Sequence, residues 1–321
     1  MDKKAVIAKY FQKIAQLNLD NTEYRKRVDE LIMFLLETDH VSQDSTTQTL
    51  LENQKQTSRA QIVSRKDSIV AGVEEVGHLL KTQTSLKFAI IHPDGAHIKA
   101  GEPMLSLSGL TTEILAYERV VLNILQRLSG IATTTHTLVS TINSLTVPNE
   151  TYVAATRKTN WGLLDKKAVG IGGGLTHRLS LSDGILVKDN HLLLLQKQFG
   201  SNSEEEVVSK VLDILLGKVK NTLLEIEVEK KESITVLIEK FLSIKTDNVL
   251  GILLDNFSPK EATEIIKELN KSYDLSNIIS EASGGITPEN IAQWAQTRVD
   301  IISLGALTHS SIAADISLDL I

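Results

Sequence analysis

Six short and almost wholly apolar segments alternate with helical patterns in the second half of the chain, and this alternation constrains the fold most. The segments are TYVAA (151–155), GILVK (184–188), LLEIEV (223–228), VLGILL (249–254), NIISEA (277–282) and DIISL (300–304). Strands that are apolar on both faces are typical of a parallel sheet covered by helices. The pattern therefore predicts an α/β fold with six parallel strands linked by helices.

The first part of the chain has a different pattern, in which helices are followed by short alternating strands. Apolar residues have helical spacing over 4–18 and 22–38, and Asn21 is placed to cap the second helix. Residues 40–56 are polar and predict a loop. Strand patterns follow in RAQIVSR (59–65), LKFAIIH (86–92) and MLSLSG (104–109). These features predict a small α/β domain with an antiparallel sheet.

Turn and capping signals add detail to this outline. The turn PDGAH (93–97) predicts a β-hairpin between the segments on either side of it. Residues 111–142 have sustained helical spacing, and Gly130 predicts a break in that helix or a junction between domains. Later helices are predicted to begin at Ser258 and at Thr287, each followed by proline.

Polar residues and glycines stand at the ends of the strands predicted after residue 150. Glu225 and Glu227 lie two apart in one strand, so their side chains face the same side of the sheet. In an α/β barrel the carboxyl ends of the strands form the mouth of the active site. The joint occurrence of these groups predicts a functional site that includes Thr156–Lys158, Lys188–Asn190, Asp255–Asn256, Ser283–Gly285 and Gly305.

The strand-end groups divide by chemistry. Arginine can hold a carboxylate through two hydrogen bonds and lysine acts as a point charge, so the cations favour a substrate with several carboxylates or phosphates. Glu227 and Asp255 suit Mg²⁺, which takes one or two carboxylates together with phosphate oxygens and water. The turn Ser283–Gly285 and Gly305 suit a phosphate bound by backbone N–H groups. Together they predict a phosphorylated substrate, magnesium and an anionic co-substrate.

Each of these residues alone has a simpler interpretation. An isolated Arg-Lys or His-Arg pair is usually solvated surface charge. The run GIGGG (170–174) lacks the spacing of a P-loop or a dinucleotide-binding motif. Glu225 and Glu227 could form an exposed edge face, and His309 could lie on a helix surface.

Composition excludes several classes of function. The formal net charge of −6 argues against binding to the phosphate backbone of nucleic acid. The chain has no cysteine, which excludes disulfides, zinc–thiolate sites, iron–sulfur ligation and thiol catalysis. The N-terminal segment lacks the apolar core of a signal peptide, and no apolar run is long enough to span a bilayer. We therefore expect a cytoplasmic protein with no membrane or nucleic-acid partner.

Several sequence blocks resemble one family of enzymes. TRKT…KKAVGIGGGLTHRLSLSDGILVKDNH (156–191) is similar to a block of the quinolinate phosphoribosyltransferase family. ERVVLNILQRLSGIAT (118–133), EIEVE, LLDN, EASGGIT and VDIISLGALTHS match further blocks of the family in the same order. The resemblance runs from about residue 57 to the C-terminus.

The resemblance implies a fold and an activity. The fold is an N-terminal α/β sandwich with an antiparallel sheet, formed by 1–129 and 306–321, and an incomplete TIM-like α/β barrel formed by 130–305. The activity is the transfer of phosphoribosyl from phosphoribosyl pyrophosphate to quinolinate with decarboxylation. It gives nicotinate mononucleotide, pyrophosphate and CO₂ for NAD biosynthesis and uses Mg²⁺. A homodimer with active sites shared between subunits, or a larger assembly, is also implied.

The same resemblance assigns roles to individual residues. Lys188, Glu227 and Asp255 are the expected catalytic residues, and the two carboxylates are also expected to hold Mg²⁺. The expected quinolinate pocket contains Arg157, Lys158, His177, Arg178, Lys188 and, from the partner chain, Arg119. The residues expected to bind the phosphoribosyl and phosphate groups are Asn190, Ser283, Gly284, Gly285, Gly305 and His309.

Two segments depart from the family pattern. ETDHVSQDSTT (37–47) lacks a glycine that many members have, and NWGLLDKKAV (160–169) is shorter and has Trp161 in place of a proline. The second segment lies beside the substrate cations and leaves the loop geometry open. Alternative functions are a phosphoribosyltransferase acting on nicotinate or another small acid, a homologue linked to molybdenum transport, and a non-catalytic protein that binds a phosphorylated metabolite.

Overall fold

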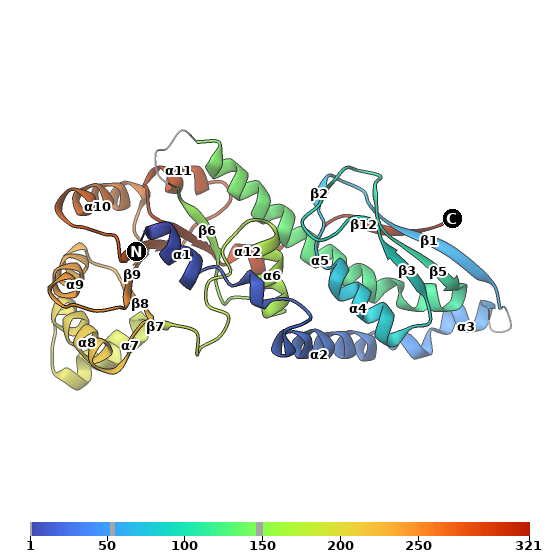
Figure 1. Ribbon diagram of the computed structural model, residues 1–321, viewed down its shortest axis with the longest axis horizontal. Helices are drawn as coiled ribbons and strands as arrows, with labels where there is room; N and C mark the ends of the chain where they lie inside the picture. The colour runs from blue at the N-terminus through green and yellow to red at the C-terminus, as the bar shows by residue number, and fades with distance from the viewer. Residues whose placement is uncertain (1, 52–54, 146–149) are drawn as a thin grey trace. The chain divides into compact units, whose positions relative to one another are not determined.

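The computed structural model describes residues 2–51, 55–145 and 150–321, which form two compact units (Figure 1). The barrel unit comprises Met1–Lys13, Leu138–Arg157 and Leu175–Leu304. The sandwich unit comprises Ile14–Thr137, Lys158–Gly174 and Gly305–Ile321. These units are groups of residues in mutual contact, and the domain boundaries expected at 129/130 and 305/306 stay a prediction.

The six strands predicted after residue 150 are confirmed, and they form one parallel sheet in the barrel unit. Their order is β6-β11-β10-β9-β8-β7. Leu175 adds a single parallel bridge to Ala154 beside β6. Among the described residues this sheet has six strands, fewer than the eight of a closed α/β barrel, so the barrel is incomplete. The strands are β6 (Tyr152–Ala155), β7 (Ile185–Val187), β8 (Leu223–Val228), β9 (Val249–Asp255), β10 (Ile278–Ser283) and β11 (Ile301–Leu304).

Helices follow the barrel strands. The start of α10 is confirmed, because Ser258 and Glu261 form a capping box around Pro259. The start predicted at Thr287 is wrong, because the Thr287 N–H donates to Asn290 Oδ1 (2.9 Å) in a turn that precedes α11. The helices are α7 (Asp189–Phe199), α8 (Glu204–Lys218), α9 (Lys231–Ser243), α10 (Pro259–Ser272) and α11 (Ile291–Gln296).

The helix α1 (Lys3–Tyr10) packs against the amino-terminal ends of the barrel strands (Figure 1). Burial of a large apolar side chain contributes about 1.5–3 kcal/mol, so this contact anchors the N-terminal segment in the barrel unit. The helix is shorter than the predicted 4–18, because it ends at Tyr10 and Phe11 continues into the core. The buried cluster includes Val6, Ile7, Phe11, Leu223, Val249, Ile279 and Ile301.

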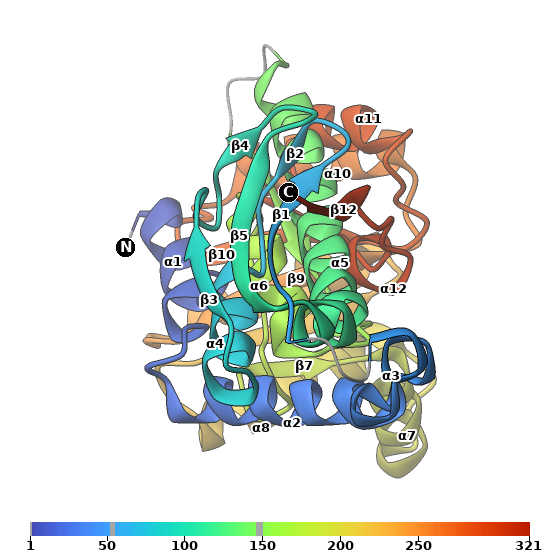
Figure 2. The same ribbon diagram turned by 90° about the vertical axis from the view of Figure 1, so that its right-hand side faces the viewer.

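The sandwich unit contains a four-stranded antiparallel sheet in the order β12-β1-β5-β3 (Figure 2). Ala60 lies opposite Leu320, so the C-terminal strand pairs with β1 as the family fold implies. The strands are β1 (Thr57–Ser64), β3 (Lys87–Ile90), β5 (Pro103–Leu110) and β12 (Ile316–Leu320). Besides α5 (Thr111–Asn143), most of which lies in this unit, its α-helices are α2 (Thr22–Thr38), α3 (Ser45–Leu51), α4 (Val73–Gln83), α6 (Leu163–Ile171) and α12 (Ala306–His309).

Two local predictions for the sandwich unit are wrong. The PDGAH turn does not close a hairpin, because β3 pairs with β5 while β4 (His97–Ile98) pairs with β2 (Ser68–Ile69). The polar segment 40–56 is not all loop, since α3 begins after Asp44, whose Oδ1 accepts the Thr47 N–H at 3.0 Å. Residues 52–54 of that segment lie outside the described residues.

The helix α5 (Thr111–Asn143) continues through Gly130 without the predicted break. A Cβ atom at position 130 would lie 1.9 Å from the carbonyl oxygen of Ile312. Glycine is therefore needed for the close approach of the C-terminal segment and does not mark a helix end. No helix within the described ranges, α5 included, is long and apolar enough to cross a membrane.

Candidate active site

Lys188 and Glu227 form an ion pair at the carboxyl end of the parallel sheet. Lys188 directly follows β7, and Val187 is paired with Ile226 of β8, so the strand register brings the two side chains together. The Lys188 Nζ lies 2.9 Å from Glu227 Oε2. Half of the Lys188 side chain is exposed (51%), whereas Glu227 is buried. The pair thus presents an ammonium group to solvent above a fixed carboxylate.

The ends of β9 and β10 form an open turn beside a second carboxylate. Asp255 is paired with Ser283 across the two strands, and Asn256 Nδ2 donates to Asp255 Oδ2 at 2.7 Å. Gly284 has a φ of +88°, and a Cβ there would lie 3.1 Å from Asp255 Oδ1. Gly285 has a φ of +61° and faces open space. Both positions favour glycine, and the turn leaves room for a ligand beside Asp255.

Arg178 is buried in the loop that precedes β7. Its Nε donates to the carbonyl oxygen of Asp183 (2.8 Å), and one terminal nitrogen donates to that of Leu181 (3.1 Å). Burial lowers the pKa of Arg178, Glu225 acts in the opposite direction, and the neighbouring Arg157 lowers it further. Two cations held this close favour binding of an anion.

The N-terminal segment fixes the loop that carries Arg178. The Phe11 carbonyl accepts the His177 N–H at 2.7 Å, and the Lys13 N–H donates to Thr176 Oγ1 at 2.8 Å. Lys13 also forms an ion pair with Asp183. Phe11 and Lys13, which precede the resemblance that begins near residue 57, therefore help to shape the cationic part of the site.

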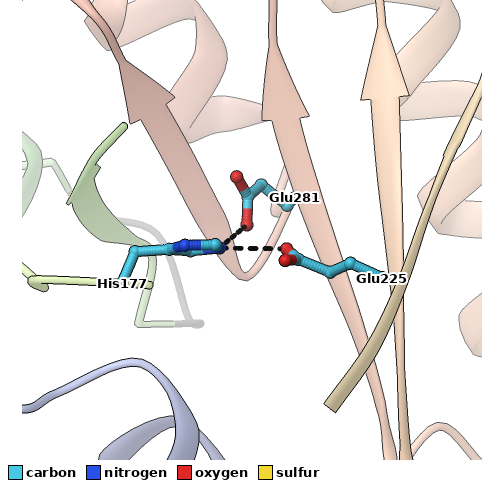
Figure 3. Close-up of side chains that lie close together, drawn as sticks. All are labelled: His177, Glu225 and Glu281. Carbon is cyan, nitrogen blue, oxygen red and sulfur yellow. Dashed lines mark hydrogen bonds and ion pairs between the residues drawn. The ribbon is translucent and has the colours of Figure 1, made fainter. Parts of the chain in front are cut away.

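His177 belongs to a buried cluster with Glu225 and Glu281 (Figure 3). Its Nε2 lies 3.0 Å from Glu225 Oε1 and 3.3 Å from Glu281 Oε2. Its Nδ1 accepts the N–H of Arg178 at 2.6 Å. Both ring nitrogens therefore have partners inside the protein. The expected contact of His177 with a substrate stays a prediction.

Charges inside this cluster are strongly coupled. Burial disfavours a charged ring, but the two carboxylates outweigh it and raise the pKa of His177. Burial also raises the pKa of Glu225 to about 7, against the effect of His177. Burial alone would raise the pKa of Glu281, but His177 and the hydrogen bonds to Glu281 outweigh burial and lower it. Glu281 is thus the carboxylate that stays ionised, and it accepts a hydrogen bond from Ser303.

Three further candidate residues lie together in the sandwich unit. The Thr308 hydroxyl donates to the Lys158 carbonyl at 2.6 Å. A Cβ on Gly305 would lie 2.8 Å from the His309 ring and 3.1 Å from Lys158 Cδ. Lys158 and His309 are exposed, so glycine at position 305 allows two solvent-facing cationic or polar groups to lie side by side.

The unusual NWG loop is organised around Asp165. This carboxylate is fully buried and accepts two hydrogen bonds from Arg127, each of 2.8 Å. It also accepts the N–H groups of Asn160 and Trp161 at 3.2 and 3.1 Å. The Arg127 guanidinium lies over the Trp161 ring, 5.1 Å from its centroid. The shortened loop therefore has a defined geometry in the sandwich unit.

Two candidate residues have no described contact with these groups. Arg119 is exposed on α5, and Asn190 is exposed in the first turn of α7. Two important residues were not singled out from the sequence, namely Glu281 and Asp165. Glu281 stands two residues before Ser283, the same strand spacing that linked Glu225 to Glu227, and this signal could have identified it.

The fold and the strand-end groups define the class of protein, an α/β-barrel enzyme for anionic, phosphorylated substrates. The chain belongs to the quinolinate phosphoribosyltransferase family. Models of the "Quinolinate phosphoribosyl transferase" C-terminal and N-terminal domains match residues 131–319 and 44–129.

Individual relatives agree with this membership. The chain is 35% identical over 293 residues to a "Probable nicotinate-nucleotide pyrophosphorylase [carboxylating]" of Methanothermobacter thermautotrophicus, covering 91% of this chain and 98% of the relative. A Bacillus subtilis protein of the same description is 35% identical over 86% of this chain and 87% of its own. The solved nicotinate-nucleotide pyrophosphorylase of Francisella tularensis has a TM-score of 0.75 at 28% identity, covering 92% of this chain and 96% of that one.

Proposed function

We propose that this chain transfers the phosphoribosyl group of phosphoribosyl pyrophosphate to quinolinate and removes one carboxylate. The products are nicotinate mononucleotide, pyrophosphate and CO₂, and the step belongs to NAD biosynthesis. The observation that carries the proposal is the Lys188–Glu227 ion pair at the carboxyl end of the sheet, with Arg178 held in its own loop near Arg157, in a member of this family. These groups supply both the cations that a dicarboxylate needs and a carboxylate that can offset positive charge on the ribose.

Quinolinate binding is assigned to the cationic residues. Arg157 and Arg178 lie close enough to affect each other electrostatically, and a dianion would relieve their repulsion. Two guanidinium nitrogens of Arg178 are already used by carbonyl groups of its own loop, so its remaining donors have a fixed direction. Lys158 is proposed as a further cation for quinolinate.

The residues present fit Mg²⁺ as well. Glu227 and Asp255 stand at the carboxyl ends of neighbouring strands, and Asp255 Oδ1 borders a turn that any side chain at position 284 would crowd. Mg²⁺ usually takes one or two carboxylates plus phosphate oxygens. When bound, the ion would neutralise charge on the pyrophosphate group.

The proposed chemistry needs positioning and electrostatic stabilisation. The quinolinate nitrogen forms a bond to the anomeric carbon while the bond from that carbon to pyrophosphate breaks. Glu227 offsets the positive charge on the ribose, and Lys188 offsets the negative charge of the departing group. The bond from C2 to its carboxylate then breaks, CO₂ leaves, and the electron pair stays on C2 beside the positive ring nitrogen until C2 takes a proton from water.

Phosphate binding is assigned to backbone groups. The turn Ser283–Gly285 has two residues with positive φ, a conformation that turns successive N–H groups toward an anion. Gly305 and His309 of the sandwich unit and Asn190 are proposed as further contacts of the phosphoribosyl part. A cytoplasmic location also belongs to this proposal and fits a chain without cysteine.

A direct assay tests the reaction against its alternatives. The full chain is incubated with phosphoribosyl pyrophosphate, Mg²⁺ and either quinolinate or nicotinate, and nucleotide and CO₂ are measured. We expect nucleotide with an equal amount of CO₂ from quinolinate and no product from nicotinate. Product from nicotinate would support the related transferase, and binding without turnover would support a non-catalytic protein.

The homodimer with shared sites is proposed as well. Arg119 is exposed on α5, where it is free to reach a neighbouring subunit. Arg119→Ala and Glu227→Gln chains, each inactive alone, are expected to regain up to about a quarter of the wild-type activity when mixed, because a random heterodimer has one intact site. Mixed dimers proven by tagged pull-down that stay inactive would contradict the shared site.

A further inference from the structure

We propose that Glu281 is a positioning residue, which acts through the ring of His177 to fix the backbone of Arg178. The inference rests on the proposed function for its meaning in catalysis, but its geometry stands on contacts within the barrel unit. It also gives His177 a structural link to Arg178, beside the substrate contact that stays a prediction. Neither Glu281 nor this link was expected from the sequence.

The first step is the direction of the hydrogen bonds around the ring. The N–H of Arg178 can only donate, so Nδ1 of His177 accepts it (2.6 Å) and carries no proton. Against the effect of burial, the two carboxylates raise the pKa of His177 and so favour a charged ring, but a second proton on Nδ1 would point at this N–H donor, and the contact therefore keeps the ring neutral. The ring proton therefore lies on Nε2, which is hydrogen-bonded to Glu225 Oε1 at 3.0 Å and lies 3.3 Å from Glu281 Oε2. The carboxylates thus favour the tautomer that is protonated on Nε2, which leaves Nδ1 able to accept the Arg178 N–H.

The second step is the burial and connectivity of the cluster. All three side chains are almost fully buried and come from three separate segments, β8, β10 and the loop before β7 (Figure 3). His177 has a φ of +53°, a conformation that residues other than glycine seldom adopt. Such a conformation persists only where neighbouring contacts enforce it. The fixed ring and the Phe11 carbonyl together hold this backbone, and Arg178 is the next residue.

The third step is to distinguish a proton on Nε2 from a metal ion bound there. One ligand atom from each of the three residues lies within 4.8 Å of the others, a spacing that a metal ion could use. Glu225 Oε2 and Glu281 Oε2 also have no hydrogen-bond partner among the described residues. A metal-bound histidine, however, normally donates from its other nitrogen. Here Nδ1 faces a donor, so a metal on Nε2 would require an imidazolate, and the proton on Nε2 is the better assignment.

A double-mutant cycle in the full-length enzyme tests the link. Glu281→Gln is expected to raise the quinolinate KM about tenfold, with kcat and the phosphoribosyl pyrophosphate KM changed less than about threefold. His177→Asn keeps an acceptor near the Nδ1 position and tolerates positive φ, but it removes the contact to Glu281. In that background Glu281→Gln should change the quinolinate KM less than about twofold. An equal effect in both backgrounds would overturn the proposal.

Glu75→Gln is the matched control. Glu75 is another buried glutamate, paired with Lys167 and Tyr24 in the sandwich unit, and its substitution should leave the quinolinate KM unchanged. A comparable rise in KM there would mean that loss of any buried carboxylate has this effect, and would also count against the proposal.

Two measurements do not depend on catalysis or on the variants' folding. Nitrogen-15 NMR of the wild-type protein should show His177 with a bare Nδ1 and a protonated Nε2, and elemental analysis should find no metal retained at the cluster. A protonated Nδ1, or a tightly held ion whose removal shifts the His177 signals, would refute the assignment. If the protein does not turn over quinolinate, only the proposed function is contradicted. The NMR and metal measurements still test the contact between Glu281, His177 and Arg178.

Discussion

Replacing Asp165 with Asn is expected to lower the free energy of unfolding by about 3–5 kcal/mol. Asp165 is fully buried and is the acceptor for Arg127, for two backbone N–H groups and for the Thr159 hydroxyl. Asparagine would leave Arg127 without its counter-charge and would turn an NH₂ group toward other donors. Removing one partner of a buried pair is costly because the other stays buried and uncompensated.

Urea unfolding of wild type and Asp165→Asn measures this loss. Asp67→Asn is the matched control, since Asp67 also accepts from a backbone N–H and pairs with Lys99 at 2.8 Å, but both side chains are exposed. Water replaces such a partner, so no measurable change is expected for the control. Equal midpoints for wild type and Asp165→Asn would show that the ion pair does not hold the NWG loop.

Replacing Glu227 with Gln is expected to reduce kcat by about 10²–10³ while the protein remains folded. The substitution keeps the shape of the side chain and removes the buried negative charge at the end of β8. It also frees Lys188 from its ion pair, so the charge balance at the reacting bond is lost. Most of the effect should be on turnover, because charge develops on the ribose only in the transition state.

Steady-state rates with quinolinate and phosphoribosyl pyrophosphate measure this effect. Glu229→Gln is the control, because Glu229 directly follows the same strand, two residues after Glu227, and is exposed. Its kcat should match that of wild type. A loss of less than tenfold for Glu227→Gln would remove this carboxylate from the transition state and leave Asp255 as the candidate acid.

Local hydrophobic periodicity predicted the barrel well. Each of the six predicted segments contains a strand, and β8, β9 and β11 are buried at nearly every position, since a strand covered on both faces needs apolar residues throughout. The strand-end pattern also placed Lys188, Glu227 and Asp255 at the carboxyl ends of their strands, where the structure has them, and their catalytic roles stay a prediction. The alternative of an exposed Glu225–Glu227 face is wrong, because both side chains are buried.

Long-range pairing could not be predicted in the same way. The PDGAH turn suggested a hairpin from local signals, but strand β3 pairs with β5 and not with the strand that directly follows the turn. Gly130 suggested a helix break, but glycine is needed there because the backbone of Ile312, a residue far along the chain, packs against it. Asp165 stands before two lysines in the sequence, a charged segment that is typical of a surface. In the structure it is fully buried in an ion pair with Arg127, which lies far away in the sequence.

The pairing of β12 with β1 has a consequence for how the protein is made. During synthesis β1 (Thr57–Ser64) emerges from the ribosome long before β12 (Ile316–Leu320). One edge of β1 therefore has no strand partner until β12 has been made. Unpaired strand edges are templates for aggregation between nascent chains. Synthesis of residues 316–320 therefore completes the sandwich sheet, and ribosome-bound chains that stop before residue 316 have an unpaired β1 edge that a chaperone could protect.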